Sequence, residues 1–161
     1  MLRITRETDY AILIMSTLAC ADAEINTASI ASLSDISQTM ASKILKMLVK
    51  ATLLVSSRGA NGGYKLSKPA SQINVADIVA AIEGPVSINN CTGIGHNCER
   101  SDDCTLAPHW VQINQIIFQA LSNVYLSDLI LPPKASKLAS KLKTGEISFP
   151  INQLIKNKTQ I

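Results

Sequence analysis

The sequence has no apolar run of membrane-spanning length and no secretory leader pattern. Although 47% of its 161 residues are apolar, a transmembrane helix needs about 20 consecutive apolar residues. The first 20 residues carry Asp9 within the apolar pattern and lack a cleavage site. We therefore expect a cytoplasmic protein with no membrane partner. A reducing cytosol favours metal binding or redox sensing over structural disulfides for its four cysteines.

The sequence also lacks the patterns that mark common enzymes. No glycine-rich phosphate loop precedes a helix, no Ser-His-Asp or Cys-His arrangement is recognisable, and no cofactor fingerprint is present. We therefore expect neither an enzymatic activity nor a small-molecule substrate. The length is that of one domain, long enough to bury a core.

Three of the four cysteines, Cys91, Cys98 and Cys104, lie within fourteen residues of one another. Glycines and a Ser-Asp-Asp run deny this segment a helical or strand period, so we expect a loop on which thiolates converge. Six and five residues separate the successive cysteines, which is wider than the Cys-x-x-Cys pairs of zinc knuckles and redox dithiols. Wide spacing favours a metal or iron-sulfur site, with surface thiols or a disulfide as alternatives.

The first third of the chain has the pattern of a helix-turn-helix. Apolar residues at helical spacing predict a helix over residues 7–21 and a short one near residues 28–34. After a turn at 35–36, a third helix runs from the N-cap Ser37 to about Lys50. Its polar and basic face is that of a recognition helix, although ordinary surface helices share the pattern. The residues expected at DNA base edges are Ser37, Gln38, Thr39, Ser42 and Lys43.

A β-hairpin with a glycine-rich tip follows this helix. The β-rich runs 53–57 and 64–67 flank the tip 58–63, which predicts the wing of a winged helix. Such a tip is small enough to enter a minor groove, and Lys65 and Lys68 could meet phosphates. A phosphate-binding loop would need a helix directly after the glycines, where the sequence has a β-run. The expected wing contacts are Arg58, Asn61, Gly62 and Lys65.

Charge is distributed unevenly along the chain. Residues 1–70 carry eight basic and five acidic side chains, residues 71–131 carry one and six, and residues 132–161 carry six and one. The basic first third fits a module that faces nucleic acid, although ordinary solvated lysines give the same balance. We expect the basic segment 132–161 to be a mobile tail, which could add nonspecific DNA affinity or have no role.

A long helix is predicted from Pro108 to Leu131, after a short helix over 75–82. One side of the long helix carries apolar residues alternately three and four apart, a seam that requires a partner helix. The partner could lie in the same chain, but few other long helices are available, so we expect a homodimer that presents two winged helices to double-stranded DNA. The seam residues are Trp110, Ile113, Ile117, Ala120 and Val124.

The expected fold class is therefore mainly α with a small β wing, a winged helix-turn-helix plus a long dimerisation helix. Residues 1–70 would form the DNA-binding region, 71–131 the cysteine loop and dimerisation helix, and 132–161 the tail.

Taken together, these segments resemble the Rrf2 family of bacterial transcriptional regulators, of the IscR and NsrR type. The resemblance covers about residues 1–131. It is carried by the opening Met-Leu-Arg-Ile-Thr, by Thr-Asp-Tyr-Ala at 8–11, by Arg-Gly-Ala-Asn-Gly-Gly-Tyr-Lys-Leu at 58–66, by residues 75–84, and by the cysteine loop followed by Trp110. Cysteine spacing and the opening residues are most similar to the subgroup that regulates SUF iron-sulfur assembly genes.

The resemblance implies that the three cysteines hold a [2Fe-2S] cluster, with a four-iron form in some relatives, and that the presence of the cluster alters DNA binding. IscR-type members place a histidine ligand three residues after the third cysteine, but this chain has Ala107 there. Asp9 matches the aspartate that the other subunit donates in the NsrR type. His109 is the second candidate, followed by His96, Glu7 or an external ligand. A nonthiolate ligand makes a cluster labile, as a sensor requires.

A different reading of the cysteines leaves the winged helix intact. The chain could be a repressor with a zinc site, in which His109 joins the cysteines, or one whose thiols are oxidised directly. The colour of the purified protein distinguishes these alternatives, because a zinc protein is colourless and an iron-sulfur protein is red or brown.

Overall fold

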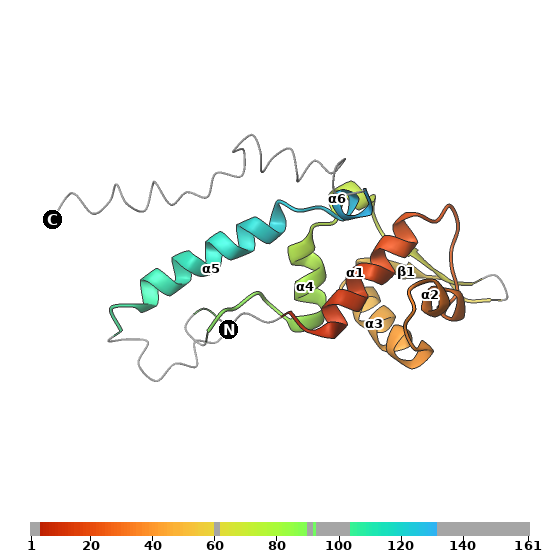
Figure 1. Ribbon diagram of the computed structural model, residues 1–161, viewed down its shortest axis with the longest axis horizontal. Helices are drawn as coiled ribbons and strands as arrows, with labels where there is room; N and C mark the ends of the chain where they lie inside the picture. The colour runs from red at the N-terminus through yellow and green to blue at the C-terminus, as the bar shows by residue number, and fades with distance from the viewer. Residues whose placement is uncertain (1–3, 60–61, 90–91, 93–103, 132–161) are drawn as a thin grey trace.

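The computed structural model describes residues 4–59, 62–89, 92 and 104–131. It confirms the expected class, mostly helical with one small antiparallel sheet (Figure 1). The elements are α1 (Arg6–Ala19), α2 (Thr27–Leu33), α3 (Gln38–Lys50), β1 (Leu54–Ser56), β2 (Tyr64–Leu66), η1 (Ala70–Gln72), α4 (Val75–Glu83), α5 (Ala107–Ser122) and α6 (Leu126–Ile130). Among the described residues, no helix is both long and apolar enough to span a bilayer.

Side-chain caps start three of the helices where the sequence predicts them. The side chains of Asn26, Ser37 and Asn74 accept hydrogen bonds from backbone amides in the first turns of α2, α3 and α4, at 2.9, 3.3 and 2.8 Å. Each bond satisfies one of the amides that a helix start leaves without a partner. Between α2 and α3 the chain reverses through Asp35, whose φ is +53°, and this turn brings Ile36 into the core.

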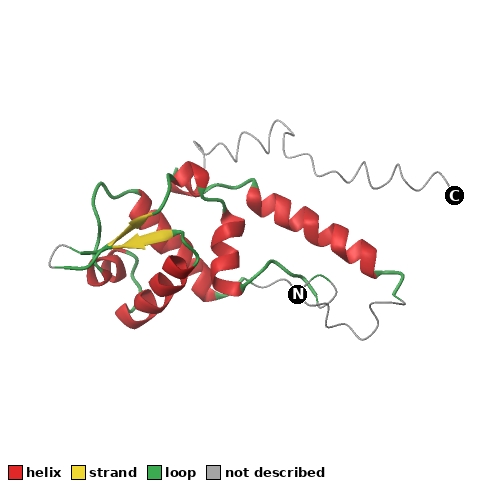
Figure 2. Ribbon diagram, turned by 180° about the vertical axis from the view of Figure 1, so that it is seen from behind, coloured by secondary structure: helices red, strands yellow, loops and turns green. Residues whose placement is uncertain are grey.

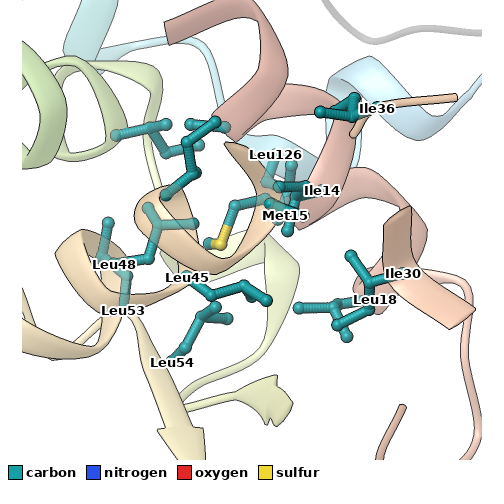
Figure 3. Close-up of a cluster of buried hydrophobic side chains, with 14 of the residues drawn as sticks. Ile14, Met15, Leu18, Ile30, Ile36, Leu45, Leu48, Leu53, Leu54 and Leu126 are labelled. Carbon is teal, nitrogen blue, oxygen red and sulfur yellow. The ribbon is translucent and has the colours of Figure 1, made fainter. Parts of the chain in front are cut away.

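The hydrophobic core lies where α1, α2, α3 and the hairpin meet (Figure 3). Ile14 and Met15 of α1 are fully buried, as are Leu45 and Leu48 of α3. Full burial of one such side chain stabilises the fold by about 1.5–3 kcal/mol. The core fixes α3 against α1, so the polar face of α3 is left at the surface.

The predicted wing is present as the β1–β2 hairpin. Leu54 pairs with Leu66 and Ser56 pairs with Tyr64 in antiparallel register. The loop between α1 and α2 also pairs with the hairpin, because Ile25 and Tyr64 of β2 form an isolated antiparallel bridge. The hairpin is therefore fixed to the helix-turn-helix by backbone hydrogen bonds. Residues 60 and 61, at its tip, lie outside the described residues.

Helix α5 extends away from the winged helix, with α4 lying between them (Figure 1 and Figure 2). None of its residues is buried. The long predicted helix is shorter than expected, because α5 ends at Ser122 and a separate helix, α6, follows. Tyr125 pairs with Asn74 in this break, so Val124 lies outside the helix that was expected to carry it.

Candidate nucleic-acid interface and cysteine segment

The start of α3 is exposed, as a recognition helix requires. Gln38 and Thr39 are exposed, whereas Ser42 is only half-exposed. The Ser37 hydroxyl accepts the capping hydrogen bond from the Met40 amide, so its oxygen serves the helix start first. The structure thus places these polar side chains together in the first turns of the second helix of the helix-turn-helix.

Lys43, the basic member of this set, is held by a carboxylate of α1. Its Nζ lies 3.4 Å from Oε1 of Glu7, and the lysine side chain keeps 58% of its exposure. A surface pair of this kind is weak, contributing about 0–1 kcal/mol. The pair nevertheless joins the expected recognition helix to the first turn of α1, a link that the sequence pattern did not indicate.

The wing carries one cation that is paired and one that is not paired within the described part of the chain. Arg58 is exposed and makes no ion pair with a described carboxylate. Lys65 pairs with Glu24, with 2.8 Å between Nζ and Oε1. Lys68, farther along, lies 3.6 Å from Asp77. Gly62 is described, but Asn61 is outside the described residues.

Two glycines allow the wing to pack closely. A Cβ at Gly63 would lie 2.7 Å from the backbone of Ile25, and one at Gly62 would lie 2.6 Å from the carbonyl oxygen of Ser57. Gly59 has a φ of +121°, a conformation that favours glycine. The glycines predicted to permit a tight tip therefore also let the hairpin lie against the α1–α2 loop.

The candidate metal ligands are only partly described. Cys91, Cys98 and His96 lie outside the described residues. Cys104 is half-exposed with a free thiol, and His109 is exposed in the first turn of α5. Within the described part of the chain, no three His, Cys, Asp or Glu side chains gather as a metal site would require.

Asp9 is exposed in the first turn of α1. Its carboxylate forms no hydrogen bond or ion pair with another described side chain. The same turn is held by a residue of α4. Oε1 of Glu83, the last residue of α4, accepts hydrogen bonds from the Thr5 amide, the Thr5 hydroxyl and the Thr8 hydroxyl at 3.0, 2.6 and 2.6 Å.

This contact shifts the ionisation of Glu83. Burial alone would raise the pKa of the Glu83 carboxyl, but the hydrogen bonds from Thr5 and Thr8 outweigh it and the pKa lies below its usual 4.5. The anion also sits at the positive end of the α1 dipole. The sequence pattern did not predict a role for Glu83. The local feature that could have marked it is a carboxylate at the last position of a helix, directly before Gly84.

A second missed residue ties α5 to the segment that leads toward the cysteines. Asn114 donates from Nδ2 to the carbonyl oxygen of Val86 at 3.0 Å and accepts from the amide of Ile88 at 3.2 Å. The sequence feature that could have marked Asn114 is an amide side chain among the apolar residues of a helix. The bonds place Val86 and Ile88, which precede the cysteine segment, alongside α5.

One face of α5 remains apolar and exposed. Trp110 and Ile113 each keep 40% exposure and Phe118 keeps 48%. Ile117 and Ala120 of the expected seam are half-buried. An apolar face of this extent on a projecting helix is typical of a protein-protein contact.

Comparisons with known proteins agree with this architecture. The family model Rrf2, described as an iron-dependent transcriptional regulator, matches residues 4–132. The chain is 35% identical to the HTH-type transcriptional regulator NsrR of Oceanobacillus iheyensis over 132 residues, which is 80% of this chain and 90% of that protein. It is 30% identical to the HTH-type transcriptional regulator IscR of Cronobacter sakazakii over 132 residues, 80% of each protein.

Solved structures show the same fold. CymR, the global cysteine regulator of B. subtilis, aligns with a TM-score of 0.63 and 28% identity over 81% of this chain and 97% of CymR. IscR of T. potens aligns with a TM-score of 0.60 and 24% identity over 80% of this chain and 86% of that one. These relatives are named as regulators rather than enzymes, in agreement with the sequence. The chain therefore belongs to the Rrf2 family of winged-helix transcriptional regulators.

Proposed function

We propose that the protein is a homodimeric, cytoplasmic regulator whose affinity for double-stranded DNA depends on an iron-sulfur cluster held by the cysteine segment. Loss, gain or oxidation of the cluster, under iron or redox or nitric oxide stress, would change its binding to the promoters of SUF-type assembly genes. The cysteine spacing and the opening residues, which are most similar to the SUF-regulating subgroup, support the choice of target.

The observation that carries this proposal is the double attachment of the first turn of α1. On one side Glu83 binds this turn at the point where α4 leads toward the cysteine segment. On the other side Glu7 pairs with Lys43 of α3. Asp9 is exposed in the same turn. A partner that binds Asp9 can therefore bias the position of α1 against the recognition helix, and so the equilibrium between two DNA-binding states.

On the DNA side, the two functional surfaces have separate roles. The start of α3 would read base edges, with Gln38 able to form two hydrogen bonds with adenine. Arg58 and Lys65 of the wing would contact the minor groove and the phosphates. The proposed set is completed by Ser37, Thr39, Ser42, Lys43, Asn61 and Gly62.

The donor set suits an iron-sulfur cluster. Cys104 offers a half-exposed free thiol, and we propose that it acts with Cys91 and Cys98. Asp9 of the other subunit would complete the set, with His109 as the second candidate. Such a cluster, which we propose is [2Fe-2S], would supply redox-responsive and labile iron. The chain's own contribution is to keep Asp9 exposed on a helix turn that Glu83 and Lys43 hold from two sides.

The exposed apolar face of α5 supports the dimer. Trp110 and Ile113 are 40% exposed and lie on one side of α5, three residues apart. Packing this face against the same helix of a second chain would remove it from water and place two winged helices on one duplex. Val124 can join this contact only from the loop after α5.

The test is an anaerobic absorption spectrum with iron and sulfide analysis, followed by DNA binding on the same sample before and after chelation. A visible cluster band, equal iron and sulfide, and a changed affinity after chelation would support the proposal. A colourless protein with stoichiometric zinc, or equal affinity with and without metal, would instead leave a zinc-bound or thiol-based repressor.

The fourth ligand is tested by comparing Asp9→Ala with His109→Ala. We expect Asp9→Ala to alter the cluster spectrum, to speed cluster loss and to change DNA affinity, whereas His109→Ala behaves as the unmodified protein. The opposite pattern would assign the ligand to His109. An Asp9→Ala protein identical to the parent in all three measurements would remove Asp9 from the mechanism.

A further inference from the structure

The base of the wing contains a carboxylate that neither the helix-turn-helix pattern nor the cysteine segment accounts for. Glu24 lies in the loop between α1 and α2, and its side chain is only 25% exposed. Oε1 accepts from Nζ of Lys65 at 2.8 Å, and Oε2 accepts a hydrogen bond from the Ser57 hydroxyl. These bonds to Lys65 and Ser57 lower the pKa of Glu24, so the carboxylate is ionised at neutral pH.

Backbone contacts hold the wing in place without help from this carboxylate. The Ile25 amide donates to the Tyr64 carbonyl oxygen at 3.1 Å, and the Tyr64 amide donates to the Ile25 carbonyl oxygen at 2.9 Å. Gly63 packs directly on the Ile25 backbone. The charge of Glu24 is therefore not needed to attach the hairpin. Its main consequence is that the ammonium group of Lys65 is held in an ion pair.

Glu24 and a DNA phosphate would compete for the ammonium group of Lys65. It lies on β2 opposite Val55, and 58% of its side chain is exposed. A DNA phosphate that approaches this ammonium must displace a carboxylate already in contact with it, and it is repelled by that same carboxylate. A phosphate contact made by a free lysine avoids both costs.

We propose that Glu24 limits the sequence-independent part of DNA affinity by holding Lys65 in an intramolecular ion pair. The inference rests on the proposed contact between the wing and DNA. Because phosphate contacts carry no sequence information, the restraint weakens binding to operator and to random DNA by the same factor. Specificity, set by the base contacts of α3, is unaffected.

The variant Glu24→Gln tests this inference. Glutamine keeps the shape of the side chain and an oxygen that accepts from Ser57, but it removes the charge that holds Lys65. We expect the full-length variant to bind a random-sequence duplex about two- to fivefold more tightly at low salt, the range for breaking one surface ion pair. The dependence of log affinity on log salt should steepen by up to about 0.9, the value for one phosphate contact, because Lys65 would then meet phosphate without competition from Glu24.

A matched control separates the ion pair from the simple loss of a negative charge. Asp22 lies in the same loop, is exposed, and makes no ion pair with a described residue. Asp22→Asn removes the same charge and should change affinity by less than Glu24→Gln. Equal gains for the two variants would overturn the inference, and so would an unchanged or weaker affinity of a Glu24→Gln protein whose thermal unfolding matches the parent.

Substitution of Lys65 by methionine distinguishes failure of this inference from failure of the proposed wing contact. In the Glu24→Gln background, Lys65→Met should cancel the gain, while in the parent it should have a smaller effect. If Lys65→Met weakens binding equally in both backgrounds, the wing contact stands and the restraint by Glu24 is refuted. If Lys65→Met has no effect in either background, Lys65 does not contact DNA. The proposed wing contact through Lys65 and the restraint by Glu24 are then both refuted.

Discussion

The hydroxyl of Thr8 donates a 2.6 Å hydrogen bond to Oε1 of Glu83, joining the first turn of α1 to the last residue of α4. The two residues are 75 positions apart in sequence, and Thr8 is fully buried. Thr5, the N-cap of α1, makes no side-chain bond to its own helix and donates to the same oxygen instead. A carboxylate from another helix thus performs the capping function.

Removal of the Thr8 hydroxyl should destabilise the fold. Thr8→Val keeps the shape and leaves Glu83 without one of three donors. Because hydrogen bonds to charged groups contribute about 1.5–3 kcal/mol and the Thr5 bonds remain, we expect a loss of about 1–2 kcal/mol in the free energy of unfolding, measured with urea. Thr39→Val, at an exposed position of α3, is the control and should change stability little. Equal losses in the two variants would contradict the capping role of Glu83.

The lowered pKa of Glu83 predicts a particular pH dependence of stability. A carboxyl whose pKa is lower in the folded state stabilises the fold above the unfolded value, here about 4.5, and this contribution disappears as the pH falls through the folded pKa. Glu83→Gln should therefore be less stable than the parent at pH 7, and the difference should shrink on acidification below about pH 4.5. Urea unfolding at several pH values measures it. A difference that stays constant across this window would show that ionisation of Glu83 does not stabilise the fold.

The close contact at Gly63 predicts a selective effect on DNA binding. An alanine Cβ there would lie 2.7 Å from the backbone of Ile25, so the wing must shift away from the α1–α2 loop. We expect Gly63→Ala to lose about 1–3 kcal/mol of stability and to bind DNA more weakly at a temperature where it is folded. Gly84→Ala provides the comparison, because Gly84 has a φ of +88° and open space around it. It should lose stability without the selective loss of DNA affinity; similar affinities in the two variants would argue against a role for wing position.

The exposed apolar face of α5 predicts a variant that does not dimerise. Ile113→Glu would place two unpaired charges in a symmetric interface, and one unpaired buried charge costs about 3 kcal/mol or more. In the proposed dimer, we expect this variant to be monomeric in sedimentation equilibrium at concentrations where the parent should dimerise, with weaker binding to a two-half-site operator. Gln112→Glu adds the same charge at an exposed position that is not three or four residues from Trp110, Ile113 or Phe118, and it should remain dimeric. A dimeric Ile113→Glu protein would place the interface elsewhere.

Local patterns predicted the helices because each depends on residues close in sequence. Apolar residues three and four apart must share one face of a helix, and Asn26, Ser37 and Asn74 reach amides only three positions ahead. The same reasoning predicted the hairpin from two β-rich runs around glycines. Local patterns also indicated the family, and the Rrf2 match over residues 4–132 confirms that assignment.

The end of α5 shows where local pattern fails. The apolar spacing continues past Ser122, yet the Val124 carbonyl oxygen accepts from the Val75 amide at 2.8 Å and the Leu126 amide donates to the Ile73 carbonyl oxygen at 2.8 Å. Backbone pairing with the start of α4 thus replaces helical bonds in this stretch. Side-chain periodicity does not predict this end of the helix, because the backbone partners lie in a segment some fifty residues earlier in the chain.

Residue type and short spacing were enough to predict the helix-turn-helix, the wing and the apolar face of α5, and they also name the candidate cysteine ligands. Tertiary packing, by contrast, sets which partner each of the carboxylates of Glu7, Glu24 and Glu83 meets. Glu7 with Lys43, Glu24 with Lys65 and Glu83 with Thr8 are pairs between different elements. Surface carboxylates have no periodic signature, and their partners follow from how the buried faces of α1, α3, α4 and the hairpin pack around one core.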